Sequence, residues 1–150
     1  MKKLTIIIPA KNESESLPQV LESLKEIDCK IIVSLKENDL KTIDSIKKFS
    51  VKIHKQKGTG YGNSLNEAIN VCETEWFCIF NADGSFDPKY LEDMLSKCEN
   101  DLDFVFASRY MNGSGTEDDT IITAIGNYAF SLIGNIFFSL RLSDILFTYL

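Results

Sequence analysis

Residues 76–83 read WFCIFNAD, a short apolar run that ends in the polar stretch Asn81-Ala82-Asp83. The run has the length and composition of a buried β-strand. A carboxylate exposed at the end of such a strand is well placed to hold a divalent cation, which can in turn bind a diphosphate. Because side chains alternate along an extended chain, Asn81 and Asp83 are expected to point the same way. The alternative is a simple Asx-type turn leading into Asp87-Pro88.

Four more apolar runs precede or follow this one, and helical patterns alternate with them. We expect strands at residues 4–8, 30–35, 51–54, 76–80 and 103–107. Helices are expected at residues 17–27, 39–48 and 63–72, and again from residue 88 onward. Near-continuous apolar strands suit a parallel sheet that is covered on both faces. The alternation therefore predicts one α/β domain over residues 1–150, with an open, mostly parallel sheet and helices on both faces.

The composition excludes several classes of function. The chain has 150 residues, of which 44% are apolar and 25% are charged, and this is enough for one domain with a core. A net charge of −6 argues against nucleic-acid binding, which normally requires a basic surface. The four cysteines include no C-x-x-C pair, which favours a reduced, cytoplasmic setting. His54 is the only histidine, so a Ser-His-Asp hydrolase is not expected.

Polar residues also follow the first predicted strand, in the stretch Pro9-Ala10-Lys11-Asn12-Glu13. A dinucleotide-binding Rossmann domain would have a glycine-rich turn here, and this stretch contains no glycine. Asn12 and Glu13 could hydrogen-bond a nucleobase or a ribose, or they could simply begin the next helix. Ligands of open α/β sheets collect at the carboxyl ends of the strands, where these residues and Asp83 are expected.

Two further segments carry groups suited to phosphate. Residues 57–62, KGTGYG, form a glycine-rich loop ahead of a predicted helix, and backbone N–H groups of such a loop favour an anion. The spacing matches neither the dinucleotide fingerprint nor a Walker loop, so a plain turn is the alternative. Arg109 follows the last predicted strand, where a guanidinium suits phosphate. A solvated surface arginine is the alternative there.

Five segments occur in a fixed order along nearly the whole chain: residues 4–13 (LTIIIPAKNE), 60–62 (GYG), 81–83 (NAD), 108–110 (SRY) and 143–144 (SD). This ordered set resembles the glycosyltransferases of family 2, which have the GT-A fold. The likeness is greatest to the branch that transfers mannose or glucose to polyprenyl (dolichol) phosphate. Each segment is common by itself, whereas the ordered set is fairly specific.

The resemblance implies a donor site and a metal site. The residues that would bind the nucleotide or the donor are Pro9, Ala10, Asn12, Glu13, Lys57, Gly60, Asn81, Ala82 and Asp83. Asp83 would be the second acid of the family's D-x-D metal motif, with Asn81 in place of the first, and the metal would be Mg²⁺ or Mn²⁺. Asp83 and Arg109 would be the catalytic residues, Arg109 holding phosphate charge.

The resemblance further implies that the donor is a nucleoside-diphosphate sugar and that polyprenyl phosphate is an acceptor, at the cytoplasmic face of a membrane. Family members continue past the Ser143-Asp144 pair, so the C-terminus is expected to be truncated. Two alternatives stay open. One is a non-catalytic nucleotide-binding or membrane-docking relative, and the other is a nucleotidyltransferase, which would want a basic, glycine-rich first loop.

The segment 121–140 contains no charged side chain and is about long enough to span a bilayer. Its polar residues recur every four positions and would form a narrow stripe on a helix; they are Thr123, Asn127, Ser131, Asn135 and Ser139. We expect a helix over residues 120–141 that lies against the sheet or at the membrane interface rather than across a bilayer. An exposed apolar face of this kind would bind a membrane or pair with a second copy as a homodimer.

Overall fold

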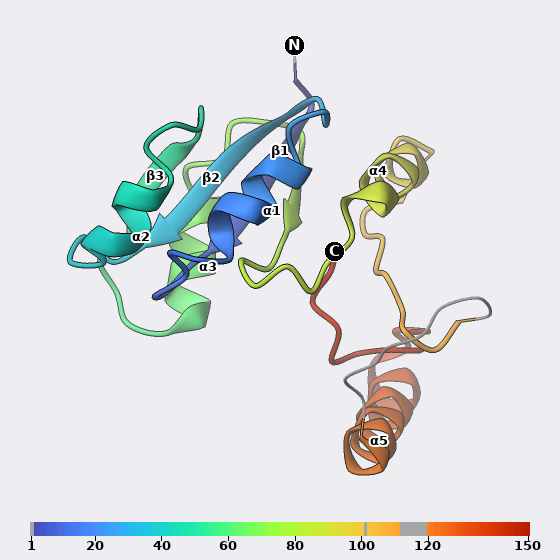
Figure 1. Cartoon of the computed structure of the whole chain (residues 1–150). Coiled ribbons are helices and arrows are strands. Elements are labelled where there is room, and N and C mark those ends of the chain that lie inside the picture. The colour runs from blue at the N-terminus through green and yellow to red at the C-terminus, as the bar shows by residue number, and fades with distance from the viewer. Residues whose placement is uncertain (1, 101, 112–119) are drawn as a thin grey trace.

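The computed structural model describes residues 2–100, 102–111 and 120–150. Its centre is a sheet of four parallel strands in the order β3-β2-β1-β4 (Figure 1). The strands are β1 (Leu4–Pro9), β2 (Cys29–Leu35), β3 (Lys52–Lys55) and β4 (Trp76–Ile79). The predicted α/β fold with a parallel sheet is therefore confirmed.

The fifth strand expected at residues 103–107 was wrong, because the described residues 102–111 contain no strand. The outer edge of β4 is instead bonded to the C-terminal segment, where the Ile79 N–H donates to the carbonyl of Leu150 at 2.9 Å. Residues 103–107 lie beyond that segment, and the Ala107 N–H donates to the carbonyl of Tyr149 at 3.0 Å. Residues 103–107 thus stay irregular, because the C-terminal segment is bonded to the edge of β4 instead.

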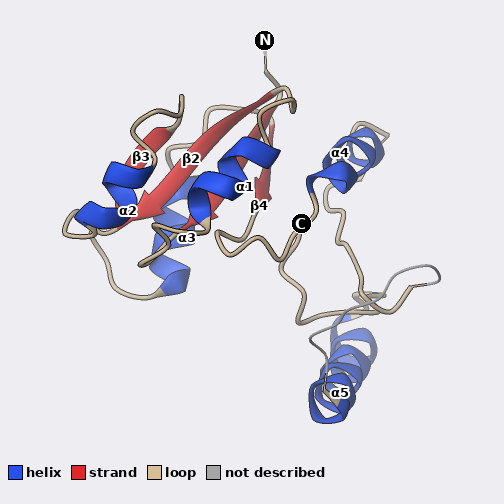
Figure 2. Cartoon of the chain, viewed as in Figure 1, coloured by secondary structure: helices blue, strands red, loops and turns tan. Residues whose placement is uncertain are grey.

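The helices cover both faces of the sheet, as expected (Figure 2). They are α1 (Leu17–Ser23), α2 (Leu40–Ser45), α3 (Tyr61–Ile69), the 3₁₀ turn η1 (Pro88–Tyr90), α4 (Leu91–Cys98) and α5 (Ile121–Phe138). On one face, Ile6 and Ile8 of β1 pack in the core shared by α1 and α4. On the other face, Ile7 packs against Ala68 of α3. The alternation of side chains along β1 therefore supplies two separate apolar layers.

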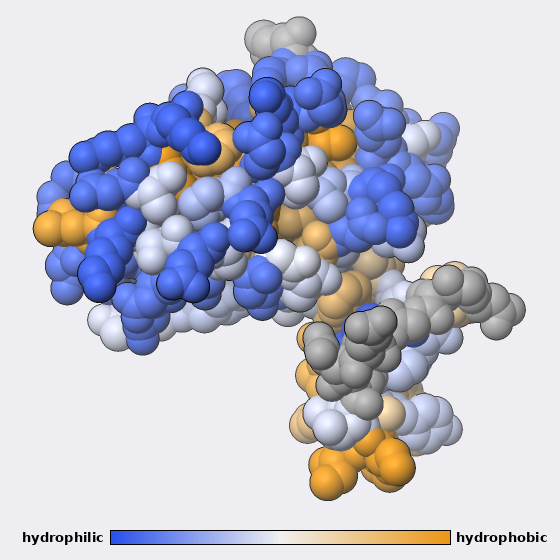
Figure 3. Space-filling view, in the orientation of Figure 1, coloured by the Kyte–Doolittle hydropathy of each residue, from blue (hydrophilic) through white to orange (hydrophobic). Residues whose placement is uncertain are grey.

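Helix α5 lies apart from the four strands (Figure 1), so of the two expected placements, against the sheet or at the membrane interface, the structure does not show the first. Its polar stripe binds the segment that follows it. Asn127 Oδ1 accepts the N–H of Leu146 at 3.0 Å, and Ser131 Oγ accepts the N–H of Ile145 at 3.2 Å. With the polar stripe turned toward the chain, the apolar side chains of α5 face outward (Figure 3).

Among the described residues, α5 is the one helix long and apolar enough to cross a membrane, judged by length and composition alone. Only 17% of it is buried, which distinguishes it from the core helix of a globular domain. Gly134 allows its close approach to the following segment, because a Cβ there would come within 2.9 Å of Ile145 Cδ1.

Tyr149 fastens the C-terminal segment to the main core. The side chain is buried, its ring stacks on Phe86 at 4.6 Å between centroids, and it meets Phe80 edge-on at 5.4 Å. Its hydroxyl donates to the carbonyl of Asp87 at 2.8 Å, and burial raises the pKa of this phenol. The aromatic cluster thereby ties the end of the chain to the loop after β4.

Tyr149→Ala should lower the free energy of unfolding by about 3–5 kcal/mol, because it leaves a cavity among packed rings. Tyr149→Phe removes only the hydrogen bond to Asp87 and should cost about 1 kcal/mol. Urea denaturation followed by tryptophan fluorescence measures both changes. Tyr128→Ala is the matched control, since Tyr128 is 70% exposed on α5. Equal effects of Tyr149→Ala and Tyr128→Ala would contradict this packing role.

Candidate functional site

A large cleft, of about 1120 Å³, opens at the carboxyl ends of β1, β2 and β4. Its lining includes Pro9, Ala10, Lys11, Asn12, Glu13, Lys36, Asn38, Asp39, Leu40, Lys41, Gln56, Thr59, Gly60, Tyr61, Ser64, Asn81, Ala82 and Asp83. Eight of the nine residues expected to bind the donor are in this set. The parallel sheet brings them together because its strands all end at one edge.

The loop after β1 is held in a defined shape by hydrogen bonds to α2. Asn12 has a left-handed backbone with φ 60°, a conformation that asparagine tolerates better than most residues. Its N–H donates to Asp39 Oδ2 at 2.7 Å, and the N–H of Glu13 donates to Thr42 Oγ1 at 3.0 Å. Glu13 Oε2 accepts the Ser16 hydroxyl at 2.6 Å. Asn12 and Glu13 are thus positioned on the cleft wall, where sequence reasoning expected them.

Asp39 is a cleft residue that sequence reasoning missed. It is the N-cap of α2, where its Oδ1 accepts the N–H of Thr42, while Oδ2 binds Asn12. Partial burial acts to raise the pKa of Asp39, but the hydrogen bonds from Asn12 and Thr42 together hold it below its ordinary value. An aspartate directly before a helical pattern is the sequence signal of an N-cap, but nothing local revealed its contact with Asn12.

Three lysines also line the cleft without having been singled out: Lys11, Lys36 and Lys41. They come from the loop after β1, the end of β2 and the first turn of α2. Lysine is a common surface residue, so the sequence alone does not indicate which lysines line a binding site. Here the three lysines line the same cleft as the carboxylates of Glu13, Asp39 and Asp83.

Asn81 and Asp83 both line the cleft, and the Asx-type turn offered as the alternative is also present. Asp83 Oδ1 accepts the N–H of Ser85 at 2.9 Å, and Gly84 follows with φ 83°. Asn81 Nδ2 donates to Ser85 Oγ at 3.0 Å, so the amide carbonyl is the Asn81 atom suited to a cation. The Asx-type turn is therefore part of the cleft wall, so the turn and a cation-binding role for this stretch are compatible.

The donor atoms at this place limit the kind of metal site. Within the described part of the chain, no group of three or more His, Cys, Asp or Glu side chains could hold a metal ion. Asn81 and Asp83 offer one carboxylate and one amide oxygen. Mg²⁺ is often bound by one or two carboxylates together with substrate phosphates. The pair therefore fits a cation that binds with a diphosphate, and does not fit a permanently bound metal.

The glycine loop lies beside the cleft, but two of its amides already bind an anion of the chain. The N–H groups of Lys57 and Gly58 donate to the carboxylate of Glu67 at 2.8 and 2.7 Å. Gly60 lines the cleft and caps α3 with φ 91°. The expected phosphate-binding amides at 57 and 58 are thus occupied by a glutamate, and the loop meets the cleft through Thr59 and Gly60.

Arg109 lies against the C-terminal segment, outside the cleft lining described above. Its Nε and Nη2 donate to Asp144 at 2.9 and 3.0 Å, and its backbone N–H donates to the same carboxylate at 3.1 Å. The guanidinium also lies over the ring of Phe147, at 5.0 Å from its centroid. The segments around 109 and 144 are therefore joined as one unit. A phosphate-binding role for Arg109 stays a prediction.

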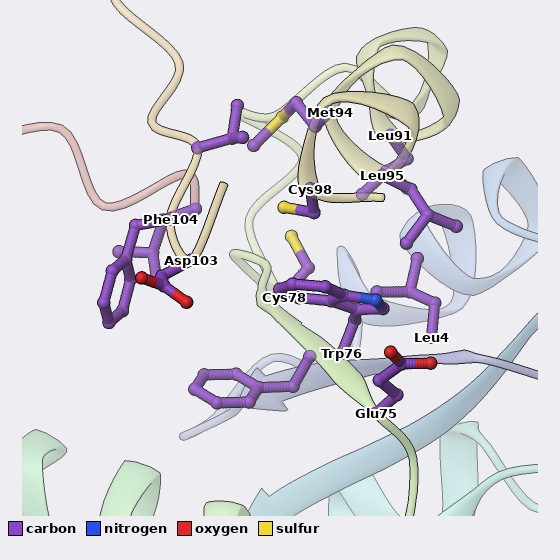
Figure 4. A pocket seen from close by; sticks show the side chains of 13 residues that line it. Leu4, Glu75, Trp76, Cys78, Leu91, Met94, Leu95, Cys98, Asp103 and Phe104 are labelled. Carbon is purple, nitrogen blue, oxygen red and sulfur yellow. The ribbon is translucent and has the colours of Figure 1, made fainter. Parts of the chain in front are cut away.

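A second hollow, of about 200 Å³, lies between β4 and α4 (Figure 4). Trp76, Cys78 and Met94 are part of its mainly apolar wall. Burial raises the pKa of the Cys78 thiol to about 12, so this sulfur is a buried apolar group and not a nucleophile. The hollow does not offer the charged groups that a diphosphate needs, and the cleft at the strand ends is the better candidate site.

The sheet order, the two helical layers and the polar cleft define a GT-A-like α/β fold. Among solved structures, the chain is similar to glucosyl-3-phosphoglycerate synthase from Mycobacterium tuberculosis, with a TM-score of 0.68 and 13% identity. That structure contains Mn²⁺, uridine diphosphate and phosphoglyceric acid. The match covers 99% of this chain and 54% of the other. A second likeness, to a mycobacterial protein, has a TM-score of 0.64, 12% identity and coverages of 99% and 52%.

The sequence comparisons point to the same class. The model of Glycosyl transferase family 2 matches residues 5–145, so the chain belongs to this family. It is 24% identical over 108 residues to an uncharacterized glycosyltransferase of Rickettsia bellii, covering 72% of this chain and 34% of the relative. It is also 24% identical over 106 residues to one of Mycobacterium bovis, covering 71% and 48%. The chain thus spans at most about half the length of these curated relatives.

Asp144→Ala should lower the free energy of unfolding by about 3 kcal/mol, because it leaves the Arg109 guanidinium without its buried carboxylate. The side chain of Asp144 is 0% exposed and that of Arg109 is 22% exposed. Denaturant unfolding measures the loss. In the control Asp93→Ala, the exposed pair with Lys97 is broken and the cost should stay below about 1 kcal/mol. A loss no larger than in this control would contradict the joining role of Asp144.

Proposed function

We propose that this chain binds a nucleoside-diphosphate sugar in the cleft and transfers the sugar to an acceptor. The observation that carries the proposal is that Asn12, Glu13 and Asp83 line one cleft at the carboxyl edge of the sheet. Membership of the family supplies the reaction class. The similar structure that contains Mn²⁺ and uridine diphosphate supports a nucleotide as the ligand.

Each part of the cleft has a task in this proposal. Asn12, Glu13 and Asp39 present hydrogen-bonding groups to the base or the ribose. Lys11 and Lys41 place positive charge near the diphosphate, and the N-terminus of α3 adds its partial positive charge. Asp83 and Asn81 would hold Mg²⁺ or Mn²⁺ together with the diphosphate. When bound, such a cation neutralises charge on the leaving group.

The proposed acceptor is polyprenyl phosphate. A phosphate oxygen of the lipid forms the new bond to the anomeric carbon, while the bond from that carbon to the donor diphosphate breaks. The diphosphate departs with the electron pair of that bond. Because the lipid phosphate is already ionised near pH 7, no general base has to remove a proton. This fits a cleft whose lining contains no histidine among the described residues.

The proposed site of action is the cytoplasmic surface of a membrane, and the exposed apolar face of α5 supports contact with a membrane. Its outward side chains include Ile122, which is 82% exposed, and Phe137, which is 75% exposed. A helix that exposes a large apolar face can lie in a membrane interface. The same face could instead join two copies of the chain into a homodimer, and the solution state decides between them.

A second candidate function is a nucleotide-binding relative with little or no catalysis. The observation that favours it is Asn81, a neutral amide at one of the two positions proposed to bind a cation. Asparagine supplies an oxygen ligand without charge, so cation binding is weaker than with two aspartates. Nucleotide binding without transfer would identify this second function.

Calorimetric titration of uridine diphosphate, with and without Mn²⁺, tests the donor site. Asp83→Asn keeps an oxygen for the Ser85 N–H but removes the charge, and it should weaken Mn²⁺-dependent binding by about tenfold or more. Asn81→Asp should strengthen it, because it adds a second carboxylate. Asp87→Asn is the control, since Asp87 also accepts a backbone N–H, from Lys89, but is not in the cleft lining. Equal affinities of all four proteins would reject the site.

Flotation with vesicles of zwitterionic lipid tests the membrane proposal. The chain should float with the vesicles, and Ile122→Asp combined with Phe137→Asp should abolish most of the binding, because charge is costly in the apolar interface. Phe104→Asp is the control, because Phe104 is 67% exposed and lies outside α5. Binding that survives the double change would contradict a role for α5. A dimer by sedimentation velocity, without flotation, would favour the homodimer instead.

A further inference from the structure

Glu67 of α3 is a charged side chain whose role the family resemblance did not predict. It points back toward the loop that precedes its own helix. Oε2 accepts the N–H of Lys57 at 2.8 Å and Oε1 accepts the N–H of Gly58 at 2.7 Å. His54 of β3 contacts Oε2 through Nε2 at 3.1 Å. Both oxygens of this carboxylate are therefore used within the chain.

Lys36 binds the carbonyl groups of the same two residues. Its Nζ donates to the carbonyl of Lys57 at 3.2 Å and also to the carbonyl of Gly58. The N–H groups of the two residues are thus bound by an anion, and their carbonyl groups by a cation. Hydrogen bonds to charged groups are about twice as strong as neutral ones. The two charges fix a backbone segment that belongs to no helix or strand.

This segment leads directly into the cleft wall. Thr59 and Gly60 line the cleft, and Gln56 Nε2 donates to the carbonyl of Gly60 at 2.9 Å. Gly58 is closely packed against Asn63, because a Cβ at residue 58 would come within 2.8 Å of Asn63 Cγ. A loop that is closely packed at Gly58 and held by two charges presents Thr59 and Gly60 in one position.

The charge on Glu67 is permanent in ordinary conditions. The hydrogen bonds from Lys57, Gly58 and His54, in that order of importance, lower the pKa of Glu67 to about 2. A carboxylate of such low pKa is a weak base, and both of its oxygens already have partners within the chain. Its chemistry is therefore that of a fixed anion.

We propose that Glu67 is a positioning residue that holds the loop 56–60 against the cleft, so that the donor nucleotide meets a wall that is already formed. This rests on the proposed function, because the cleft is taken as the donor site. Glu67 is not among the residues that line the cleft, and in this proposal it acts on the donor through the amides of Lys57 and Gly58. A preformed loop loses less conformational entropy on binding, and affinity rises accordingly.

Glu67→Gln is the sharpest test on the full chain, because it keeps the size of the side chain and replaces one acceptor oxygen by an NH₂ group. In amide NMR spectra, the Lys57 and Gly58 proton signals should move upfield and their hydrogen exchange should quicken. The affinity for uridine diphosphate with Mn²⁺ should fall by about tenfold, at a temperature where both proteins are folded. Glu73→Gln is the matched control, since exposed Glu73 binds Lys30 and is not in the cleft lining.

The outcomes separate this proposal from the proposed function. Unmoved Lys57 and Gly58 signals in Glu67→Gln, or unchanged affinity despite moved signals, would overturn the positioning role. If the unaltered chain fails to bind uridine diphosphate, the donor function falls, while the two amide signals still decide whether Glu67 holds the loop. If Glu67→Gln does not fold, exchange in the unaltered chain decides. Protected amides at Lys57 and Gly58 support the proposal, and rapid exchange at both overturns it.

Discussion

Strand β1 is paired along both edges, to β2 on one side and to β4 on the other, and the candidate site depends on this pairing. All three strands run in the same direction, so their carboxyl ends meet at one edge. The loops that follow them carry Asn12, Asp39 and Asp83 into one cleft. None of these side chains lies near another in sequence. The parallel register is what makes a common binding surface out of three separate loops.

Around this edge, much of the charge is committed to contacts within the chain. Asp39 binds the backbone of Asn12, Glu67 binds the backbone of the glycine loop, and Asp144 binds Arg109. Each carboxylate fixes a segment that lacks regular secondary structure at that point. Buried or half-buried backbone groups must find partners, and here carboxylates supply them. The irregular segments at Asn12 and at Lys57-Gly58 are therefore held by hydrogen bonds to carboxylates of the chain.

Helix α5 follows a different physical principle from the other helices. Helices α1 and α3 bury apolar side chains against the sheet, whereas α5 turns its polar stripe toward the chain and its apolar side chains outward. The hydrogen bonds from Asn127 and Ser131 to the segment after the helix explain this orientation. The apolar face of α5 is therefore exposed, and in the proposed function it contacts the membrane.

The sequence by itself determined the elements whose signal is local. The apolar runs in β1, β2 and β4 predicted buried parallel strands, and the polar residues behind them predicted which edge would bind a ligand. It also predicted a polar stripe on the last helix. These results are local because the alternation and periodicity of side chains depend on neighbours in the chain.

Only the tertiary structure decided the contacts between distant segments. Residues 103–107 read as a strand, but the edge of β4 is bonded to Leu150 instead. The glycine loop was predicted to bind phosphate. The carboxylate of Glu67, nine and ten residues further on, instead accepts hydrogen bonds from the N–H groups of Gly58 and Lys57. The ion pair between Arg109 and Asp144, 35 positions apart, had no local signal in the sequence, while a phosphate-binding role for Arg109 stays a prediction. The sequence shows that backbone amides and a guanidinium need hydrogen-bond partners. Which partner comes within reach depends on the fold.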